Sequence, residues 1–346
     1  MQTTVLRILS FGAGAIGTYI GGSLALSGHN VVFLEQPAVA ADLRQRGFRL
    51  KLGENEHILT NLRILSNIEE ALNAGPYDAA LFALKSYDTR PALDAWQPYL
   101  ASLPPVLCLQ NGVENEATLS RALGAERVIA GTITTAIGRR AAGDIVVERL
   151  RGMGVAAGHP LSTLLVQTLE AAGLNACLYP KAADMKWSKM LTNLLANASS
   201  AILDMDPAEI FANPDLFRLE VEQLREALRI MSIKNIRTVD LPKTPVRALA
   251  FAVTRLPTAI SRALLARRVG GGRGGKMPSF HIDLHSGRGL SEVDYLNGAV
   301  VRYGEKLGVP TPVNRLLNNT LLALVQGRIP LDAFAHQPEK LLAGRK

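Results

Sequence analysis

Gly12-Ala13-Gly14-Ala15-Ile16-Gly17 is the stretch from which the architecture of this chain can be worked out. An apolar run from Val5 to Phe11 precedes it, and a helical pattern from Ile16 to Leu26 follows. A second apolar run, Val31 to Leu34, comes next, so strand, glycine turn, helix and strand fit within about thirty residues. This order is typical of a dinucleotide-binding βαβ unit.

The three glycines of this stretch have different physical tasks. Gly12 allows a sharp turn off the strand, Gly14 leaves room for a pyrophosphate, and Gly17 lets the helix lie close to the sheet. The start of the helix offers unpaired N–H groups to the phosphates. The alternative is a glycine-rich turn that binds nothing, which the clean strands on both sides disfavour. The residues predicted to contact the cofactor here are Gly12, Ala13, Gly14, Ala15, Ile16 and Gly17.

Length and composition indicate an ordinary globular protein. With 346 residues, 48% hydrophobic and 20% charged, the chain can form two domains, each with its own core. No apolar run reaches the roughly eighteen residues of a membrane span, and the sequence opens without the pattern of a signal peptide. Cys108 and Cys177 lie in apolar surroundings, which favours buried thiols over a disulfide. We therefore expect a cytoplasmic protein without a membrane partner.

The net charge of +8 is concentrated in one segment. Residues 234–276 contain ten Lys or Arg and one acid, Asp240, so this segment carries +9 and the rest of the chain −1. We interpret it as a solvated surface, and an anionic ligand or partner is the alternative. Phe251 is the only aromatic residue in the segment, which argues against stacking on nucleic acid bases.

The pattern of apolar runs predicts two domains. Strand and helix patterns alternate up to about residue 178, which indicates a parallel sheet covered by helices on both faces. Helical patterns alone follow from Lys181. We therefore predict a dinucleotide-binding domain over residues 1–178 and a helical substrate domain over residues 179–346. The expected strands are Leu6–Phe11, Val31–Leu34, Ala79–Leu84, Val106–Leu109, Val128–Thr132, Ile145–Val147 and Val155–Ala157.

Several local features of the second domain are also predicted. Ala182–Leu203 reads as one long helix, and Ser291–Asp294 fits a capping box that opens a helix running to Leu307. Gly270–Gly275 is expected to be a loop. The tail from Pro338 has no packing signal and is expected to fray.

Three polar residues lie on one face of the predicted long helix. Lys189, Asn193 and Asn197 are spaced at i, i+4 and i+8. A lysine can protonate a carbonyl oxygen, and asparagine can orient polar substrate groups without titrating. The alternative is a solvent-facing polar stripe, but the neighbouring residues are largely apolar, which indicates a helix that is mostly buried.

Five stretches of the sequence resemble the ketopantoate reductase (2-dehydropantoate 2-reductase) family. They are Gly12–Gly17, Leu84-Lys85-Ser86, Gln110-Asn111-Gly112-Val113, Trp187-Ser188-Lys189-Met190 with Asn193 and Asn197, and Ser291–Gly298. The resemblance implies an N-terminal Rossmann-type parallel sheet domain followed by an all-helical C-terminal domain. It also implies an oxidoreductase of pantothenate biosynthesis, which reduces 2-dehydropantoate to pantoate, or a related 2-keto acid, with NAD(P)H.

The same resemblance implies roles for individual residues. Lys189 would be the general acid, and Lys186, one turn earlier, is the rival. Lys85 and Asn111 would face the nicotinamide, and Glu292 would contact cofactor or substrate hydroxyls. The residues expected to bind the substrate are Asn111, Asn193, Asn197 and Ser279.

The sequence departs from the family pattern at two places. Gln36 stands where the family commonly has an Arg that pairs with the 2′-phosphate of NADP. Glu35, 18 residues after Gly17, suits a free ribose 2′-hydroxyl, so NADP(H) is the cofactor that the family implies and NAD(H) the one that this position favours. The basic, glycine-rich insert before Pro278 leaves open whether ketopantoate or another 2-keto acid is the substrate.

The sequence also allows alternative sites and functions. His281 and His285 are spaced for metal ligands on a helix, but the sequence supplies no third or fourth ligand, so we predict no metal. A related hydroxyacid or opine dehydrogenase, and a non-catalytic NAD(P)H-binding regulatory protein, are the alternative functions. The expected partner is a small-molecule 2-keto acid. The sequence does not decide whether the chain forms a homodimer.

Overall fold

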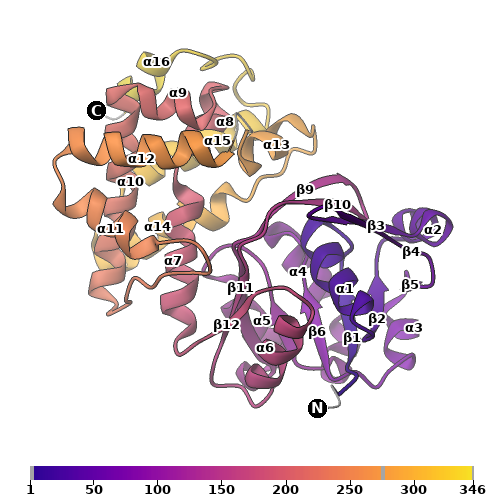
Figure 1. Cartoon of the computed structure of the whole chain (residues 1–346). Helices are drawn as coiled ribbons and strands as arrows, with labels where there is room; N and C mark the ends of the chain where they lie inside the picture. The colour runs from indigo at the N-terminus through magenta and orange to yellow at the C-terminus, as the bar shows by residue number, and fades with distance from the viewer. Residues whose placement is uncertain (1–3, 274–276, 345–346) are drawn as a thin grey trace. The chain divides into compact units, whose positions relative to one another are not determined.

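The computed structural model describes residues 4–273 and 277–344. The chain forms two compact units, which are shown in Figure 1. The N-terminal unit comprises residues 1–186 together with 241–244, and the helical unit comprises residues 187–240 and 245–346. Helix α7 (Ala182–Leu194) begins in the first unit and continues into the second.

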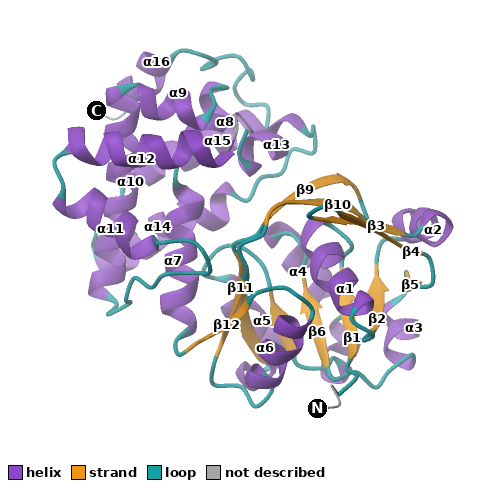
Figure 2. Cartoon of the chain, in the orientation of Figure 1, coloured by secondary structure: helices purple, strands orange, loops and turns teal. Residues whose placement is uncertain are grey.

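The N-terminal unit is built on an eight-stranded sheet, shown in Figure 2. The strand order is β12-β11-β8-β7-β6-β1-β2-β5, and β11 against β8 is the one antiparallel pairing among the pairs described. Six of the seven predicted strands lie in this sheet. Its members are β1 (Arg7–Phe11), β2 (Asn30–Leu34), β5 (Arg63–Leu65), β6 (Ala79–Phe82), β7 (Val106–Cys108), β8 (Val128–Ile133), β11 (Met153–Ala156) and β12 (Ala176–Tyr179).

Helices cover both faces of the sheet, as predicted. Side chains alternate along each strand, so Val31 and Phe33 join one core whereas Val32 and Leu34 join the other. Helices α1 (Ala15–Leu26) and α6 (Ser162–Ala171) pack on the first core. The helices that pack on the second core are α3 (Ile68–Asn73), α4 (Thr89–Ala95) and α5 (Asn115–Leu123).

A second, four-stranded sheet in this unit was not predicted. Its order is β4-β3-β10-β9, and helix α2 (Pro37–Arg46) precedes it in the chain. The predicted strand Ile145–Val147 lies here rather than in the main sheet, because the fully buried Ile145 packs into the same core as Phe48. The strands are β3 (Phe48–Leu52), β4 (Asn55–Leu59), β9 (Ala136–Ala141) and β10 (Asp144–Arg149).

Among the described residues of the helical unit, helices are the only regular secondary structure, as predicted. Helix α10 is the longest, and it packs against α9, α11, α14 and α15. The helices after α7 are α8 (Ala198–Leu203), α9 (Pro207–Ala212), α10 (Pro214–Ile233), α11 (Val246–Arg255), α12 (Thr258–Arg273), α13 (Ser279–His285), α14 (Val293–Leu307), α15 (Pro312–Val325) and α16 (Pro338–Ala343).

The prediction of one long helix over Ala182–Leu203 is wrong. The chain breaks between α7 and α8, where Ala196 adopts a left-handed backbone with φ of 52°. The buried Glu220 carboxylate of α10 accepts a hydrogen bond from the Ala196 N–H at 2.6 Å. A carboxylate from a distant helix therefore satisfies the N–H at the break.

Three smaller predictions for this unit also need correction. The Ser291 hydroxyl accepts from the N–H of Val293 at 3.2 Å, so no capping box forms at α14. Helix α12 continues through the first glycines of Gly270–Gly275 to Arg273, and residues 274–276 lie outside the described residues. The tail does not fray at Pro338, because α16 buries Leu341.

The two cysteines differ in environment. Cys108 is buried, as predicted, whereas Cys177 is exposed on β12 at the edge of the main sheet. Within the described parts of the chain, we find no helix with the length and apolar character that crossing a bilayer would require.

Candidate functional site

The predicted cofactor residues of the N-terminal unit follow four neighbouring strands. Glu35, the Gly12 turn, Lys85 and Asn111 come after β2, β1, β6 and β7, which are adjacent in the sheet. The strand ends are level, because Phe11 lies opposite both Leu34 and Phe82. The chain adds β2 and β5 on one side of β1 and then crosses to β6 and β7 on the other side, so this edge is the switch point where ligands bind in such sheets.

The glycine turn has the geometry that its sequence predicts. Gly12 has φ of +92°, and its N–H donates to the Leu34 carbonyl at 3.0 Å. A Cβ added to Gly17 would lie 1.9 Å from the Gly12 carbonyl oxygen, so α1 packs too closely there for any side chain. A Cβ added to Gly14 would meet nothing within 4 Å. The space over Gly14, at the start of α1, is therefore open to a phosphate.

The Glu35 carboxylate lies against this turn. Its Oε1 accepts a hydrogen bond from the Ala13 N–H, and its Oε2 accepts from the Gln36 N–H at 3.1 Å. The side chain of Gln36 is neutral and the residue is exposed. The local charge beside the turn is therefore negative, which disfavours a second phosphate at this point.

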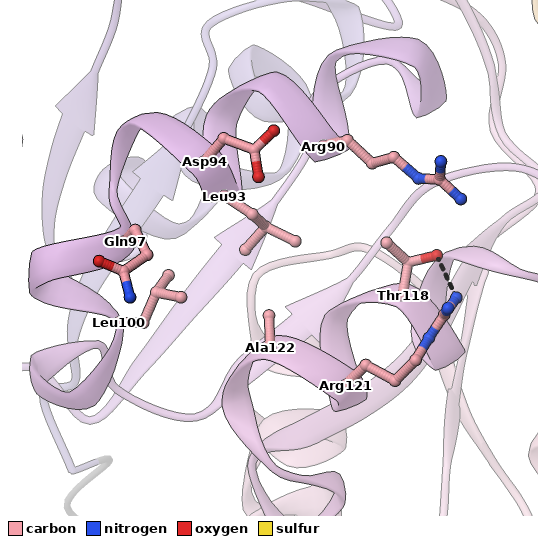
Figure 3. A pocket seen from close by; sticks show the side chains of 8 residues that line it. All are labelled: Arg90, Leu93, Asp94, Gln97, Leu100, Thr118, Arg121 and Ala122. Atoms are coloured by element: carbon pink, nitrogen blue, oxygen red, sulfur yellow. Dashed lines mark hydrogen bonds between the residues drawn. The ribbon is translucent and has the colours of Figure 1, made fainter.

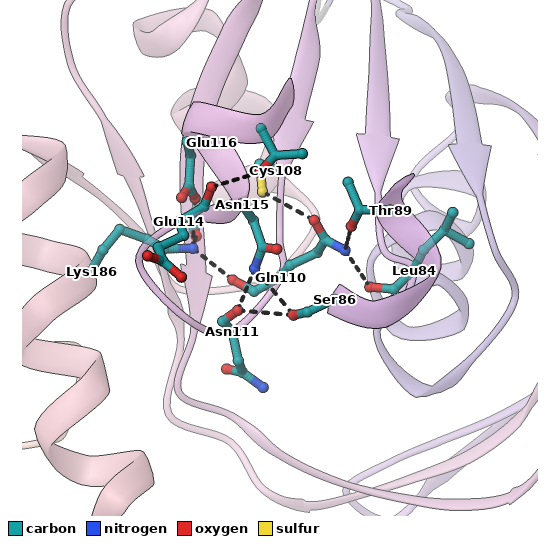
Figure 4. Close-up of polar contacts among 12 residues, drawn as sticks. Leu84, Ser86, Thr89, Cys108, Gln110, Asn111, Glu114, Asn115, Glu116 and Lys186 are labelled. Carbon is teal, nitrogen blue, oxygen red and sulfur yellow. Dashed lines mark hydrogen bonds and ion pairs between the residues drawn. The ribbon is translucent and has the colours of Figure 1, made fainter. Parts of the chain in front are cut away.

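A buried hydrogen-bond network fixes the loops that carry Lys85 and Asn111 (Figure 4). The Gln110 amide donates to the Lys85 carbonyl at 3.1 Å. Asn115 donates to the Ser86 hydroxyl at 3.1 Å, and that hydroxyl donates to the Asn111 carbonyl at 3.2 Å. Lys85 is half-buried and Asn111 is exposed. Gln110 and Ser86 belong to stretches that carry the family resemblance, but their positioning role was not predicted, and Asn115 was not predicted at all.

Lys186, the rival acid, is held inside the N-terminal unit (Figure 4). Its Nζ lies 2.6 Å from Glu116 Oε1, 2.6 Å from the Gln110 carbonyl oxygen and 3.2 Å from that of Gly131. Burial alone would lower the pKa of Lys186, but the Glu116 carboxylate and the Cys108 sulfur outweigh it, so the pKa is raised. An ammonium that keeps its proton so firmly suits an anchor better than a proton donor.

Lys189 and Asn193 lie one turn apart on α7, in the helical unit. Both are half-buried, and the neighbouring Trp187, Met190 and Leu191 are buried, as their apolar character predicts. The i, i+4 spacing places the two polar side chains on the same face of α7.

Asn197 is displaced from that face by the helix break, so the prediction of a three-residue stripe on one helix is wrong. It starts α8 instead, and its amide nitrogen donates to the Asn193 carbonyl at 3.0 Å and to the Ser279 hydroxyl at 3.3 Å. Its Oδ1 accepts from the Phe280 N–H at 3.1 Å. The structure therefore brings the side chains of Asn197 and Ser279 together beside the backbone carbonyl of Asn193, and Asn197 also ties α13 to α8.

Glu292 lies at the start of α14, as predicted, and is 5% exposed. Its contact with a cofactor or substrate hydroxyl stays a prediction.

Two interaction partners could not be predicted from the sequence. Glu116 pairs with Lys186, and Asp204 lies beside the histidine pair, 77 residues before His281. Neither separation corresponds to a local spacing rule.

A hollow on the N-terminal unit lies elsewhere (Figure 3). It opens beside α4 and α5, and on its α5 side the Arg121 guanidinium donates to the Thr118 hydroxyl at 3.4 Å. No residue of the predicted site lines it. The lining residues are Arg90, Leu93, Asp94, Gln97, Leu100, Thr118, Arg121 and Ala122.

A glycine turn at the switch point of a mostly parallel sheet, followed by a helical unit, is typical of two-domain NAD(P)-dependent oxidoreductases. The family model described as ketopantoate reductase PanE/ApbA matches residues 8–157, and the model of its C-terminal part matches residues 181–325. The chain belongs to the ketopantoate reductase PanE/ApbA family.

Full-length relatives and solved structures agree with this assignment. The 2-dehydropantoate 2-reductase of Pyrococcus horikoshii is 26% identical over 90% of this chain and 95% of its own, and that of Archaeoglobus fulgidus 26% over 93% and 98%. A crystal structure of a PanE/ApbA family ketopantoate reductase from Ralstonia eutropha JMP134 has a TM-score of 0.77 at 26% identity, covering 93% and 99%. D-mandelate dehydrogenase with NADH and anilino(oxo)acetate has a TM-score of 0.74 at 22% identity, covering 93% and 99%, a likeness of fold alone.

Proposed function

We propose that this protein reduces 2-dehydropantoate, or a close 2-keto acid analogue, to the 2-hydroxy acid with NAD(P)H. The observation that carries the proposal is the position of Asn193, one helical turn after Lys189 on α7, next to Asn197, whose amide donates to the Asn193 backbone carbonyl and to the Ser279 hydroxyl. This arrangement combines a proton donor with neutral hydrogen-bonding groups, which is what reduction of a polar carbonyl requires. Relatives named 2-dehydropantoate 2-reductase support the substrate.

The residues present in the N-terminal unit fit a dinucleotide. Gly14 leaves the space that a pyrophosphate needs, and the N–H groups at the start of α1 face it. Lys85 and Asn111, on loops of the same edge, would flank the nicotinamide. When bound, NAD(P)H supplies the hydride that adds to C2 of the keto acid.

The residues of the helical unit would supply the proton and hold the substrate. Lys189 Nζ donates one proton to the carbonyl oxygen, so the ketone becomes a hydroxyl and the lysine is left neutral. Asn193 and Ser279 donate hydrogen bonds to the polar groups of the keto acid, and Glu292 accepts one from a hydroxyl. Holding the carbonyl beside both donors converts a collision between two molecules into an oriented step.

A kinetic screen tests this function. The oxidation of NADH and of NADPH is followed separately against 2-dehydropantoate, pyruvate, 2-ketoisovalerate and benzoylformate. We expect the highest kcat/KM with 2-dehydropantoate. A higher value with benzoylformate would move the assignment to a mandelate-type dehydrogenase. Tight NAD(P)H binding with no turnover of any keto acid would favour the non-catalytic regulatory protein instead.

Glu35 is expected to set the cofactor preference. We propose that the chain accepts NADPH, as the family implies. The Glu35 carboxylate lowers the ratio of kcat/KM for NADPH to kcat/KM for NADH. Glu35→Gln keeps an oxygen that can accept from the Ala13 N–H and removes one negative charge. Loss of the repulsion should raise the kcat/KM ratio of NADPH to NADH by about 10-fold.

The matched control for this change is Glu54→Gln, which removes an exposed charge from the turn between β3 and β4. Its cofactor ratio should equal that of the wild type. If the kcat/KM ratio of NADPH to NADH is also unchanged in Glu35→Gln, then Glu35 does not discriminate between a 2′-hydroxyl and a 2′-phosphate on the cofactor ribose.

A further inference from the structure

A pair of histidines on α13 lies outside the proposed reaction. His281 and His285 are four residues apart, and their ring centroids lie 4.2 Å from each other. This spacing directs both side chains to the same side of the helix. A pair of imidazoles at this separation is a common half of a metal site.

A carboxylate from another element completes the group. Asp204 ends α8 in a left-handed conformation with φ of 51°, and its Oδ1 lies 2.7 Å from His281 Nε2. One ligand atom from each of Asp204, His281 and His285 lies within 4.8 Å of the others. All three residues belong to the helical unit, so the group is complete within one compact body.

We propose that Asp204, His281 and His285 form a binding site for a divalent transition-metal ion, and that Zn²⁺ is the physiological ion. Two imidazoles and one carboxylate suit zinc and its neighbours, whereas Mg²⁺ and Ca²⁺ favour oxygen ligands alone. A tetrahedral ion with bonds of about 2.1 Å requires ligand atoms about 3.4 Å apart. Side-chain rotations at these solvent-accessible positions can supply the adjustment, and the fourth position is left to water.

The proposed metal would complete the attachment of α13 to α8. Asn197, at the start of α8, already holds Ser279 and Phe280 at the start of α13. Asp204, at the end of α8, faces the histidines of α13. An ion there would fix α13 at a second point, so it should stabilise the helical unit even if the proposed reductase function is wrong.

Cobalt provides a direct spectroscopic test. Tag-free protein carrying Cys177→Ala, which removes the exposed thiol as a competing ligand, is titrated with Co²⁺ at pH 7.5. We expect a saturable visible d–d band with one ion per chain, which stoichiometric Zn²⁺ abolishes. Zn²⁺ should also raise the thermal unfolding midpoint, because it binds the folded state alone.

Variants distinguish a metal site from an ordinary ion pair. Asp204→Asn retains a residue that tolerates the left-handed turn, and His285→Gln changes an exposed position, so both should fold. Each should weaken Co²⁺ binding by about 10-fold or more and abolish the Zn²⁺ stabilisation. His57→Gln, on β4, is the matched control and should bind as the wild type. Absence of the band, or binding by either site variant as tight as that of the wild type, would overturn the proposal.

Discussion

Lys189→Ala is expected to lower kcat by about 10²–10⁴-fold while the Kd for NADPH changes little, because a positioned general acid contributes a factor of this size. Apart from Glu292, the residues proposed to contact the cofactor belong to the N-terminal unit, whereas Lys189 belongs to the helical unit. Removing its side chain should therefore affect the chemical step and leave cofactor binding in place. Steady-state kinetics and fluorescence titration with NADPH measure the two effects separately.

Two further variants decide what Lys189 contributes. Lys189→Arg retains the positive charge but does not release a proton at neutral pH, so it should stay as slow as Lys189→Ala if proton donation is the role. Recovery of activity in Lys189→Arg would instead indicate electrostatic stabilisation. Lys181→Ala, at an exposed lysine just before the same helix, should leave kcat unchanged. Wild-type turnover in Lys189→Ala would remove this residue from the mechanism.

The N-terminal unit could be predicted because its central strands are buried on both faces. Such strands read as continuous apolar runs, and Val31 to Leu34 is an example. The four-stranded sheet was not predicted because its strands are half-exposed. β3 reads Phe-Arg-Leu-Lys-Leu, an alternation with period two that was available in the sequence, whereas β4 and β9 are too polar to stand out.

In the candidate site, some residues could be placed from the sequence and others could not. Residues that follow strand ends could be named, because parallel strands bring their carboxyl ends to one edge. The position of Asn197 could not, because Leu194-Leu195-Ala196 has good helix propensity and the break depends on Glu220 of another helix. Tertiary hydrogen bonds overrode local preference at Ala196, and only the tertiary fold brings Asp204 beside His281.

Lys186 gives the second large effect, on stability rather than on turnover. Lys186→Met should lower the free energy of unfolding of the N-terminal unit by about 3–5 kcal/mol, because it leaves the Glu116 carboxylate without its buried partner. The pKa of Lys186 is raised above its ordinary value of 10.5. Its stabilising contribution is therefore fully present below pH 10.5 and is lost only as the pH rises through the folded-state pKa.

The two tryptophans allow this loss to be assigned to the N-terminal unit. Trp96 stacks on Phe11 there, with ring centroids 4.6 Å apart, whereas Trp187 belongs to the helical unit. In a Trp187→Phe background, denaturant unfolding followed by Trp96 fluorescence reports the N-terminal unit alone. The double change Lys186→Met with Glu116→Leu should recover most of the lost stability, since no charge is then left unpaired. A loss below about 1 kcal/mol in the single variant, or no recovery in the double, would mean that the pair does not anchor α7.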